Sequence, residues 1–258
     1  MKKIILALMV LCSSIFAGEI TVAAAANVTY AMNKLIKEFN KTNPNTKVQV
    51  VLGSSGQLVT QMENGALYDI FMSADMKFPQ ALYEKNLATT VPVVYAQGAI
   101  AMFSAKELDY SKGINLLKES SISKIAVANP KTAPYGTAAI EAMKNAGIEN
   151  ATKDKLVFAE SISQVVTYAS TATDIGLIAK SSLYDEKMAQ YKENKNWLSV
   201  DPKLYTPINQ GIVIVDNTKN LVGLIRTNEK NVEVKAFYDF ILSANAKKIF
   251  EDYGYIVK

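Results

Sequence analysis

The 258-residue sequence contains no histidine, one cysteine and a single arginine, Arg226. Histidine and cysteine supply most of the metal ligands and activated nucleophiles of enzymes, so their scarcity argues against metal-dependent and nucleophilic catalysis. The cysteine, Cys12, lies close to the N-terminus. If that end is removed on export, the mature chain has no thiol and therefore no disulfide.

The sequence also lacks a strong net charge. The formal charge of +4 includes Lys2 and Lys3, which lie in a segment expected to be removed, leaving about +2. The remaining basic residues are scattered along the chain, so no nucleic-acid partner is expected. Hydrophobic residues make up 49% and charged residues 20% of the chain, which is typical of a folded globular protein.

Residues 1–17 have the order of a secretory signal peptide. Lys2 and Lys3 precede the apolar run 4–11, and small residues lead to Ala17, after which cleavage is expected. The apolar run is too short to span a bilayer. Lipid anchoring through Cys12 is disfavoured, because Leu11 before it is larger than such sites prefer. The sequence therefore predicts an exported protein.

Strand-like and helix-like segments alternate along the rest of the chain. β-rich runs at 19–25, 47–52, 69–73, 125–128 and 155–158 are each followed by residues at helical spacing. The run 174–179 is one more buried strand, and 232–253 is helical. This alternation predicts an α/β protein with mostly parallel sheets. Two longer β-rich runs, 91–104 and 205–215, exceed an ordinary strand and indicate two crossings between two lobes.

The sequence Gly53-Ser54-Ser55-Gly56-Gln57 joins a strand to a helix. The first N–H groups of a helix have no partner within it and carry partial positive charge. Gly53 and Gly56 let the backbone approach a ligand, and the serines add O–H donors, so this loop is suited to binding an anion. The alternative is an ordinary turn with a serine N-cap.

Three further strand-to-helix junctions repeat this arrangement. Asn27 is expected to be the N-cap of the first long helix, either as a cap alone or also as a ligand contact. Since ligands of such sheets bind at the carboxyl ends of the strands, two lobes would bring the junctions to one cleft. The candidate lining residues are Ala26, Asn27, Ser54, Ser55, Tyr135, Gly136 and Ile162.

None of these lining residues is charged. Neutral donors without a matching acceptor suit a fully deprotonated oxyanion, because a protonated one needs an acceptor for its own O–H. Asp75 has no partner carboxylate or histidine at useful spacing and is interpreted as a cap or structural residue. Lys131 and Glu160 are the nearest titratable groups to the proposed cleft.

Three segments resemble the periplasmic molybdate-binding proteins of ABC importers. They are residues 20–32 (ITVAAAANVTYAM), 65–75 (GALYDIFMSAD) and the ending 234–258, and the similarity extends from Glu19 to Lys258. The resemblance implies a bilobal type II periplasmic-binding-protein fold, with two mixed, mostly parallel sheets flanked by helices and a two-strand hinge. Lobe 1 would comprise residues 18–98 and 208–258, and lobe 2 residues 99–207.

The resemblance further implies that Asn27, Ser55 and the backbone of Tyr135 and Ile162 contact the oxyanion. Many members have serine in place of Asn27, a small residue in place of Tyr135, and tyrosine where this chain has Ala179. The Tyr135 hydroxyl could replace the donor missing at Ala179, or Tyr135 could act through its backbone alone. The implied partners are molybdate or tungstate and a permease in the inner membrane, with the protein monomeric, periplasmic and free of cofactors.

Two other functions remain open at the level of sequence. A receptor for sulfate or another tetrahedral oxyanion would use the same neutral donors. An enzyme on the same bilobal fold would need a titratable group in the cleft loops, and those loops supply no convincing one. A structural or adhesive surface protein would leave the four strand-to-helix junctions unexplained.

Overall fold

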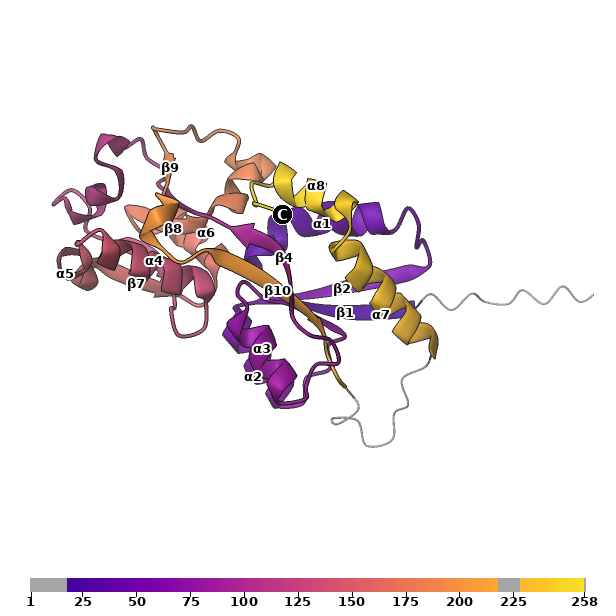
Figure 1. Cartoon of the computed structure of the whole chain (residues 1–258). Coiled ribbons are helices and arrows are strands. Elements are labelled where there is room, and N and C mark those ends of the chain that lie inside the picture. Colours follow the sequence, from indigo (N-terminus) through magenta and orange to yellow (C-terminus); the bar gives the residue numbers. More distant parts are fainter. Residues whose placement is uncertain (1–17, 218–227, 258) are drawn as a thin grey trace, which may run out of the picture.

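The computed structural model describes residues 18–217 and 228–257 and contains two five-stranded sheets. Figure 1 shows the two sheets as neighbouring bodies, each with helices packed against it. The predicted signal peptide at 1–17, including Cys12, lies outside the described residues, as does Arg226. Within the described ranges, no helix has the length and hydropathy needed to cross a bilayer.

The first sheet has the strand order β2-β1-β3-β10-β4. β1 is parallel to β2 and β3, whereas β10 is antiparallel to β3 and β4. Alternate residues of β1 face different cores, with Val22 and Ala24 on one side and Ala23 on the other, as the two-residue period of a strand requires. The strands are β1 (Gly18–Ala25), β2 (Thr46–Gly53), β3 (Ile70–Met72), β4 (Val93–Gly98) and β10 (Ile208–Ile214).

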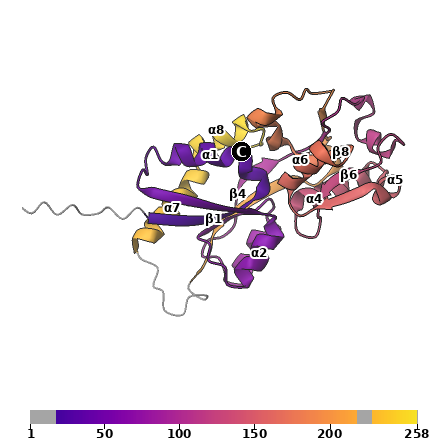
Figure 2. The same cartoon turned by 180° about the vertical axis from the view of Figure 1, so that it is seen from behind.

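Helices cover both faces of this sheet (Figures 1 and 2). One face packs against α1 (Thr29–Phe39), α7 (Asn228–Ile241) and α8 (Ala244–Asp252), which contribute Leu35, Phe237 and Phe250 to one core. The opposite face packs against α2 (Ser55–Glu63) and α3 (Lys77–Glu84), which contribute Leu58 and Leu82 to a second core.

The second sheet has the order β7-β6-β8-β5-β9, with β6 parallel to β7 and β8, and β5 antiparallel to β8 and β9. Its strands are β5 (Ile100–Phe103), β6 (Ile125–Ala128), β7 (Leu156–Ala159), β8 (Ile175–Ala179) and β9 (Trp197–Ser199). Around it lie α4 (Pro134–Asn145), α5 (Glu149–Thr152), α6 (Ile162–Thr171), and the 3₁₀ segments η2 (Tyr110–Lys118), η3 (Lys153–Lys155), η4 (Lys180–Tyr184), η5 (Glu186–Met188) and η6 (Pro202–Leu204).

The chain passes between the sheets where the long β-rich runs predicted crossings. β4 ends in the first sheet at Gly98, and β5 begins in the second at Ile100. The chain returns between Ser199, the end of β9, and Ile208, the start of β10. β4 and β10 pair with each other, so the two connections lie side by side. The prediction of two mixed sheets flanked by helices is confirmed.

Several element boundaries differ from the predictions. The helix expected after the run 125–128 begins at Pro134, because proline is well accommodated in the first turn. The helical segment expected at 232–253 is two helices, since Ser243 caps α8 by accepting a hydrogen bond from the Ala246 N–H at 3.3 Å. The short strand β9 and the 3₁₀ segments were not predicted.

Candidate functional site

Four helices begin around one small cavity between the two sheets. η1 (Ala26–Val28) follows β1, and α2 follows β2 after Ser54, so the first sheet contributes two helix starts. α4 and α6 follow β6 and β7 and contribute two more from the second sheet. The cavity is lined by Ala25, Ala26, Asn27, Gly53, Ser54, Ser55, Ala74, Ala133, Pro134, Tyr135 and Ile162.

The cavity is narrow. Its volume of about 10 Å³ is room for about one water molecule, so a tetrahedral oxyanion would have to widen it. Pockets that bind larger organic ligands usually measure roughly 300–1,000 Å³. The geometry therefore favours a small ion over a sugar or an amino acid.

Six of the seven predicted lining residues line this cavity: Ala26, Asn27, Ser54, Ser55, Tyr135 and Ile162. Ala26 and Asn27 lie in η1, Ser55 is the first residue of α2, and Ile162 is the first residue of α6. Gly136, the other predicted lining residue, does not line the cavity. A Cβ atom at Gly136 would lie 2.1 Å from the Ala128 carbonyl oxygen, so this glycine allows α4 to pack against β6.

Ser55 provides a hydroxyl proton at the cavity. Its side chain is fully buried, and its Oγ accepts a hydrogen bond from the Ala74 N–H at 3.0 Å. This contact fixes the oxygen and leaves the hydroxyl proton for a ligand. The neighbouring Ser54 differs, because its Oγ donates to Gln57 Oε1 at 2.8 Å within the capping box at the start of α2.

Gly56 brings the backbone of α2 close to another part of the protein and not to the ligand cavity. The sequence predicted that this glycine lets the backbone approach a ligand. In the structure, the Gly56 N–H donates to the Thr132 carbonyl at 2.9 Å, which joins α2 to the loop before α4 in the other lobe. A Cβ atom at Gly56 would lie 3.0 Å from Thr132 Cα. Gly56 therefore serves the contact between the lobes.

Asn27 is not the N-cap that the sequence predicted. α1 begins at Thr29, after the 3₁₀ turn, and Ala25 occupies the capping position of that turn without a side-chain hydrogen bond. The helical spacing of the following residues could not reveal this extra turn. Asn27 is instead fully buried, and its Nδ2 donates to Gln210 Oε1 at 2.9 Å and to Tyr255 Oη at 3.1 Å.

Tyr135 reaches from α4 to the strands that connect the lobes. Its hydroxyl accepts a hydrogen bond from Gln210 Nε2 at 3.0 Å and lies beside Gly98 of β4. Burial, reinforced by the nearby Tyr255 and Tyr95, raises the pKa of Tyr135 well above its usual value. The phenol is therefore neutral at physiological pH and can act only as a hydrogen-bonding group.

Sequence reasoning missed the side chains behind the cavity wall. Gln210, Tyr95, Tyr255 and Ser181 are all buried and form hydrogen bonds with Asn27, with one another or with Tyr135. One signal was available, since Gln210 is a polar residue within the β-rich run 205–215, where only Gly211 and apolar residues follow it. A buried amide in such a strand needs partners, which points to a polar network.

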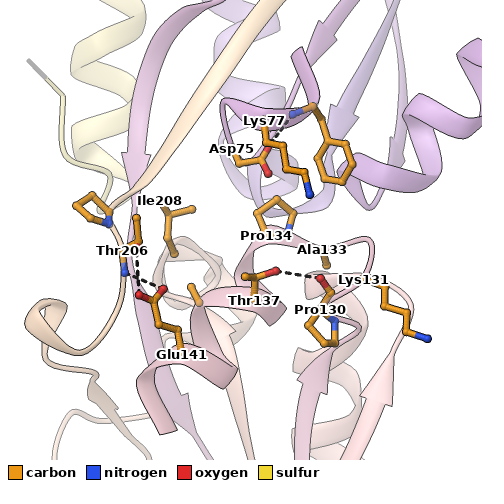
Figure 3. A pocket seen from close by; sticks show the side chains of 13 residues that line it. Asp75, Lys77, Pro130, Lys131, Ala133, Pro134, Thr137, Glu141, Thr206 and Ile208 are labelled. Atoms are coloured by element: carbon orange, nitrogen blue, oxygen red, sulfur yellow. Dashed lines mark hydrogen bonds between the residues drawn. The ribbon is translucent and has the colours of Figure 1, made fainter. Parts of the chain in front are cut away.

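Charged side chains lie in a neighbouring pocket of about 200 Å³ (Figure 3). This pocket shares Ala133 and Pro134 with the small cavity and is bordered by Asp75, Lys77, Lys131 and Glu141. Glu141 accepts hydrogen bonds from the Thr206 N–H and hydroxyl. Lys131 is exposed, and Figure 3 shows its side chain pointing away from the pocket.

Asp75 has the structural role that the sequence predicted. Its Oδ1 accepts hydrogen bonds from the Phe78 N–H at 3.1 Å and from the Ser73 hydroxyl at 3.0 Å, at the start of α3. Burial raises its pKa, and these hydrogen bonds act in the opposite direction. Glu160 is exposed and does not line the small cavity. Within the part of the chain that the structure describes, no group of three His, Cys, Asp or Glu side chains could hold a metal ion.

The chain is similar in sequence and in structure to proteins that are named molybdate-binding proteins. The chain is 33% identical to the molybdate-binding protein ModA of Azotobacter vinelandii, over 93% of this chain and 90% of that protein. It is 32% identical to the molybdate-binding protein ModA of Rhodobacter capsulatus, over 94% of this chain and 90% of that protein. The solved periplasmic molybdate-binding protein of Azotobacter vinelandii superposes with a TM-score of 0.81 at 26% identity, covering 93% of this chain and 99% of that one.

The family profile for bacterial extracellular solute-binding proteins matches residues 20–256. Proteins of this family bind solutes and are not enzymes, so the enzyme alternative is not favoured. The match spans both sheets and all four helix starts around the cavity. The chain therefore belongs to the family of bacterial extracellular solute-binding proteins.

Proposed function

We propose that the protein captures molybdate in the cavity between its two sheets and delivers it to the permease of an ABC importer. The observation that carries this proposal is the meeting of four helix starts around a small cavity that no charged side chain lines. The relatives named as molybdate-binding proteins support the choice of anion. The protein would act as a monomer, without a cofactor, and would accept tungstate as well.

The chemistry of the lining favours a fully deprotonated anion. Backbone N–H groups at the helix starts, together with the Ser55 hydroxyl, offer donors with partial positive charge. Fixed donors of this kind can replace the hydration shell of a buried dianion without a counter-charge. None of the lining residues has a carboxylate to accept a proton from the ligand.

Both lobes supply these donors, which explains how binding and closure are coupled. Asn27 and Ser55 come from the first lobe, and Tyr135 and Ile162 from the second. An anion held by one lobe alone would leave part of its surface in water. An anion held by both stabilises the closed arrangement, as a ligand that binds one conformation better must do.

The predicted signal peptide at 1–17 and the family of exported proteins support a periplasmic location. A sulfate receptor is the nearest alternative within the same class. Sulfate and molybdate are both tetrahedral dianions, so selection between them would depend mainly on the size of the cavity.

The test is a titration of the chain beginning at Gly18 with molybdate, tungstate and sulfate, by calorimetry and by thermal unfolding. Molybdate and tungstate should bind and raise the unfolding temperature, since a ligand at a thousandfold excess over its Kd stabilises the native state by about 4 kcal/mol. Sulfate at equal concentration should have little effect. Equal responses to the three anions would contradict the selectivity, and no response to any would contradict the function.

A further inference from the structure

Gln210 occupies a central position between the two lobes. It lies in β10, one of the two strands that connect the sheets, and its side chain is fully buried. Its Oε1 accepts hydrogen bonds from Asn27 Nδ2 at 2.9 Å and from the Tyr95 hydroxyl at 2.8 Å. Its Nε2 donates to the Tyr135 hydroxyl at 3.0 Å. One side chain thus contacts a cavity residue from each lobe.

The surrounding backbone is shaped around this contact. A Cβ atom at Gly98 of β4 would lie 2.0 Å from the Tyr135 hydroxyl oxygen and 2.6 Å from Gln210 Nε2. Only glycine leaves room there for the tyrosine to reach the connecting strands. The hydrogen bond between Tyr135 and Gln210 therefore depends on the glycine at position 98.

The direction of these hydrogen bonds matters for an anion. Asn27 Nδ2 has two protons, and Gln210 and Tyr255 accept them both. Asn27 Oδ1 is buried and has no hydrogen-bond partner among the described residues. Tyr95 has one hydroxyl proton, yet two acceptors lie within reach, Gln210 Oε1 at 2.8 Å and the Ser73 carbonyl at 3.2 Å. In this arrangement, the Asn27 side chain has no proton to offer a ligand.

Turning over both amides gives a second arrangement with the same heavy-atom positions, because the oxygen and nitrogen of an amide are nearly the same size. Gln210 Nε2 then donates to Asn27 Oδ1 and to the Tyr95 hydroxyl, and Tyr95 donates to the Ser73 carbonyl. The Tyr135 hydroxyl donates to Gln210 Oε1. The Tyr255 hydroxyl then donates to Asn27 Oδ1 instead of the Asn27 carbonyl, which keeps the hydrogen bond from the Ser181 hydroxyl. The Asn27 Nδ2 protons are no longer taken up by Gln210 and Tyr255 and can be donated to an anion.

We propose that Gln210 is a positioning residue for oxyanion binding. It orients the Asn27 amide so that its NH2 group faces the anion, and it holds the Tyr135 side chain in place beside Asn27. The proposal rests on the function proposed above. Asn27 lines the cavity, whereas Gln210 does not, so Gln210 acts on the ligand only through Asn27 and Tyr135. Because Gln210 is on a connecting strand, it also couples ligand binding to the conformation of the strands that join the lobes.

The first test is Gln210→Met, which keeps the size of the side chain and removes its hydrogen bonds. Loss of the donor that Gln210 orients toward the charged ligand should weaken molybdate binding about tenfold to a hundredfold. The matched control is Gln97→Met on the paired strand β4. Among the described residues, no hydrogen bond joins the Gln97 side chain to Asn27 or Tyr135, so the affinity of this variant should stay within about twofold of the wild type. Wild-type affinity in Gln210→Met would overturn the proposal.

A second measurement separates positioning from a purely structural role. The side-chain amide signal of Asn27 can be followed by ¹⁵N NMR and identified by its absence in Asn27→Ser. Molybdate should shift this signal in the wild type, and the shift should be much smaller in Gln210→Met at saturating molybdate. If the wild-type signal stays unchanged on binding, the proposal is wrong even if Gln210→Met does not fold. If the wild type does not bind molybdate at all, the proposed function fails instead.

Discussion

Ser55 is the side chain most directly prepared to donate to the anion. Its Oγ is fixed by the Ala74 N–H, and its proton has no competing acceptor among the described residues. A hydrogen bond to a charged group contributes about 1.5–3 kcal/mol. Ser55→Ala should therefore weaken molybdate binding about tenfold to a hundredfold, measured by calorimetry.

The control for this substitution is Ser170→Ala, which removes an exposed hydroxyl from α6. That variant should bind like the wild type, because surface substitutions far from a site have small effects. If Ser55→Ala also bound like the wild type, Ser55 would not be a ligand contact and the site assignment would be wrong.

Tyr135→Phe tests whether the tyrosine acts through its hydroxyl. The hydroxyl is the partner of Gln210 Nε2, and its removal leaves a buried polar group unsatisfied, which costs about 1–3 kcal/mol. We expect the affinity for molybdate to fall about tenfold because Gln210 no longer holds Asn27 and Tyr135 together. Titration of the variant measures this change. Affinity within twofold of the wild type would mean that only the backbone N–H of Tyr135 contributes.

At the scale of single residues, the sequence predicted the residues that line the cavity and missed the buried side chains that hydrogen-bond to them. Ser55 and Ile162 could be found because each starts a helix after a strand, and that local pattern is visible in the sequence. Gln210 and Tyr255 are far from Asn27 along the chain and meet it only through the packing of several elements. No local spacing rule predicts such contacts, and the polar Gln210 before an apolar stretch of the β-rich run was the available hint.

Among the elements, the start of α2 has two roles. Ser55 faces the cavity, while Gly56 contacts Thr132 of the opposite lobe. Gly56→Ala places a methyl group 3.0 Å from Thr132 Cα and 3.2 Å from its carbonyl oxygen, so the lobes must separate slightly. Overpacking of this kind costs about 1–3 kcal/mol, which corresponds to about a fivefold to hundredfold loss of affinity.

The control on the same helix is Glu63→Gln, which changes an exposed residue at the other end of α2. It should leave molybdate affinity within twofold. Thermal unfolding of the Gly56→Ala protein without ligand measures the strain within the first lobe, because the new methyl group would also lie 3.0 Å from Phe78 Cζ of α3. Unchanged affinity in Gly56→Ala would show that the contact with Thr132 is unimportant for closure.

The connecting strands were the most predictable elements. The run 91–104 is broken at Gly98 and Ala99, between β4 and β5, and the run 205–215 leads from the connection into β10 at Ile208. The structure uses both runs to pass between the sheets. The 3₁₀ turn before α1 and the break between α7 and α8 were not predicted. Both depend on local capping and tertiary packing, which the hydrophobic period of a helix does not record.

For the whole molecule, the buried tyrosine hydroxyls should make the folded state less stable as the pH rises into the alkaline range. Burial raises the pKa values of Tyr95, Tyr135 and Tyr255 above their usual value of about 10. The folded chain therefore keeps these protons at a pH where the unfolded chain loses them. Their contribution to stability is complete below about pH 10 and is lost as the pH rises further, up to the raised pKa values.

The unfolding temperature should accordingly fall more between pH 9 and pH 11 in the wild type than in Tyr95→Phe. Tyr83→Phe is the control, because Tyr83 is 38% exposed. Its unfolding temperature should depend on pH as in the wild type. An identical alkaline fall in Tyr95→Phe and the wild type would contradict the assignment, since lysines that titrate in the same range would then explain the effect.

Binding of molybdate should, in contrast, be nearly independent of pH between about 6 and 9. The lining residues have no group that titrates in that window, and the three buried phenols behind them keep their protons throughout it. Calorimetric titrations at pH 6, 7.5 and 9 should give affinities within about twofold. Lys131→Gln should behave in the same way, because Lys131 borders the neighbouring pocket and points away from it. A steep change in the wild type that Lys131→Gln abolished would place that lysine at the ligand, and the neutral-donor description of the site would have to be abandoned.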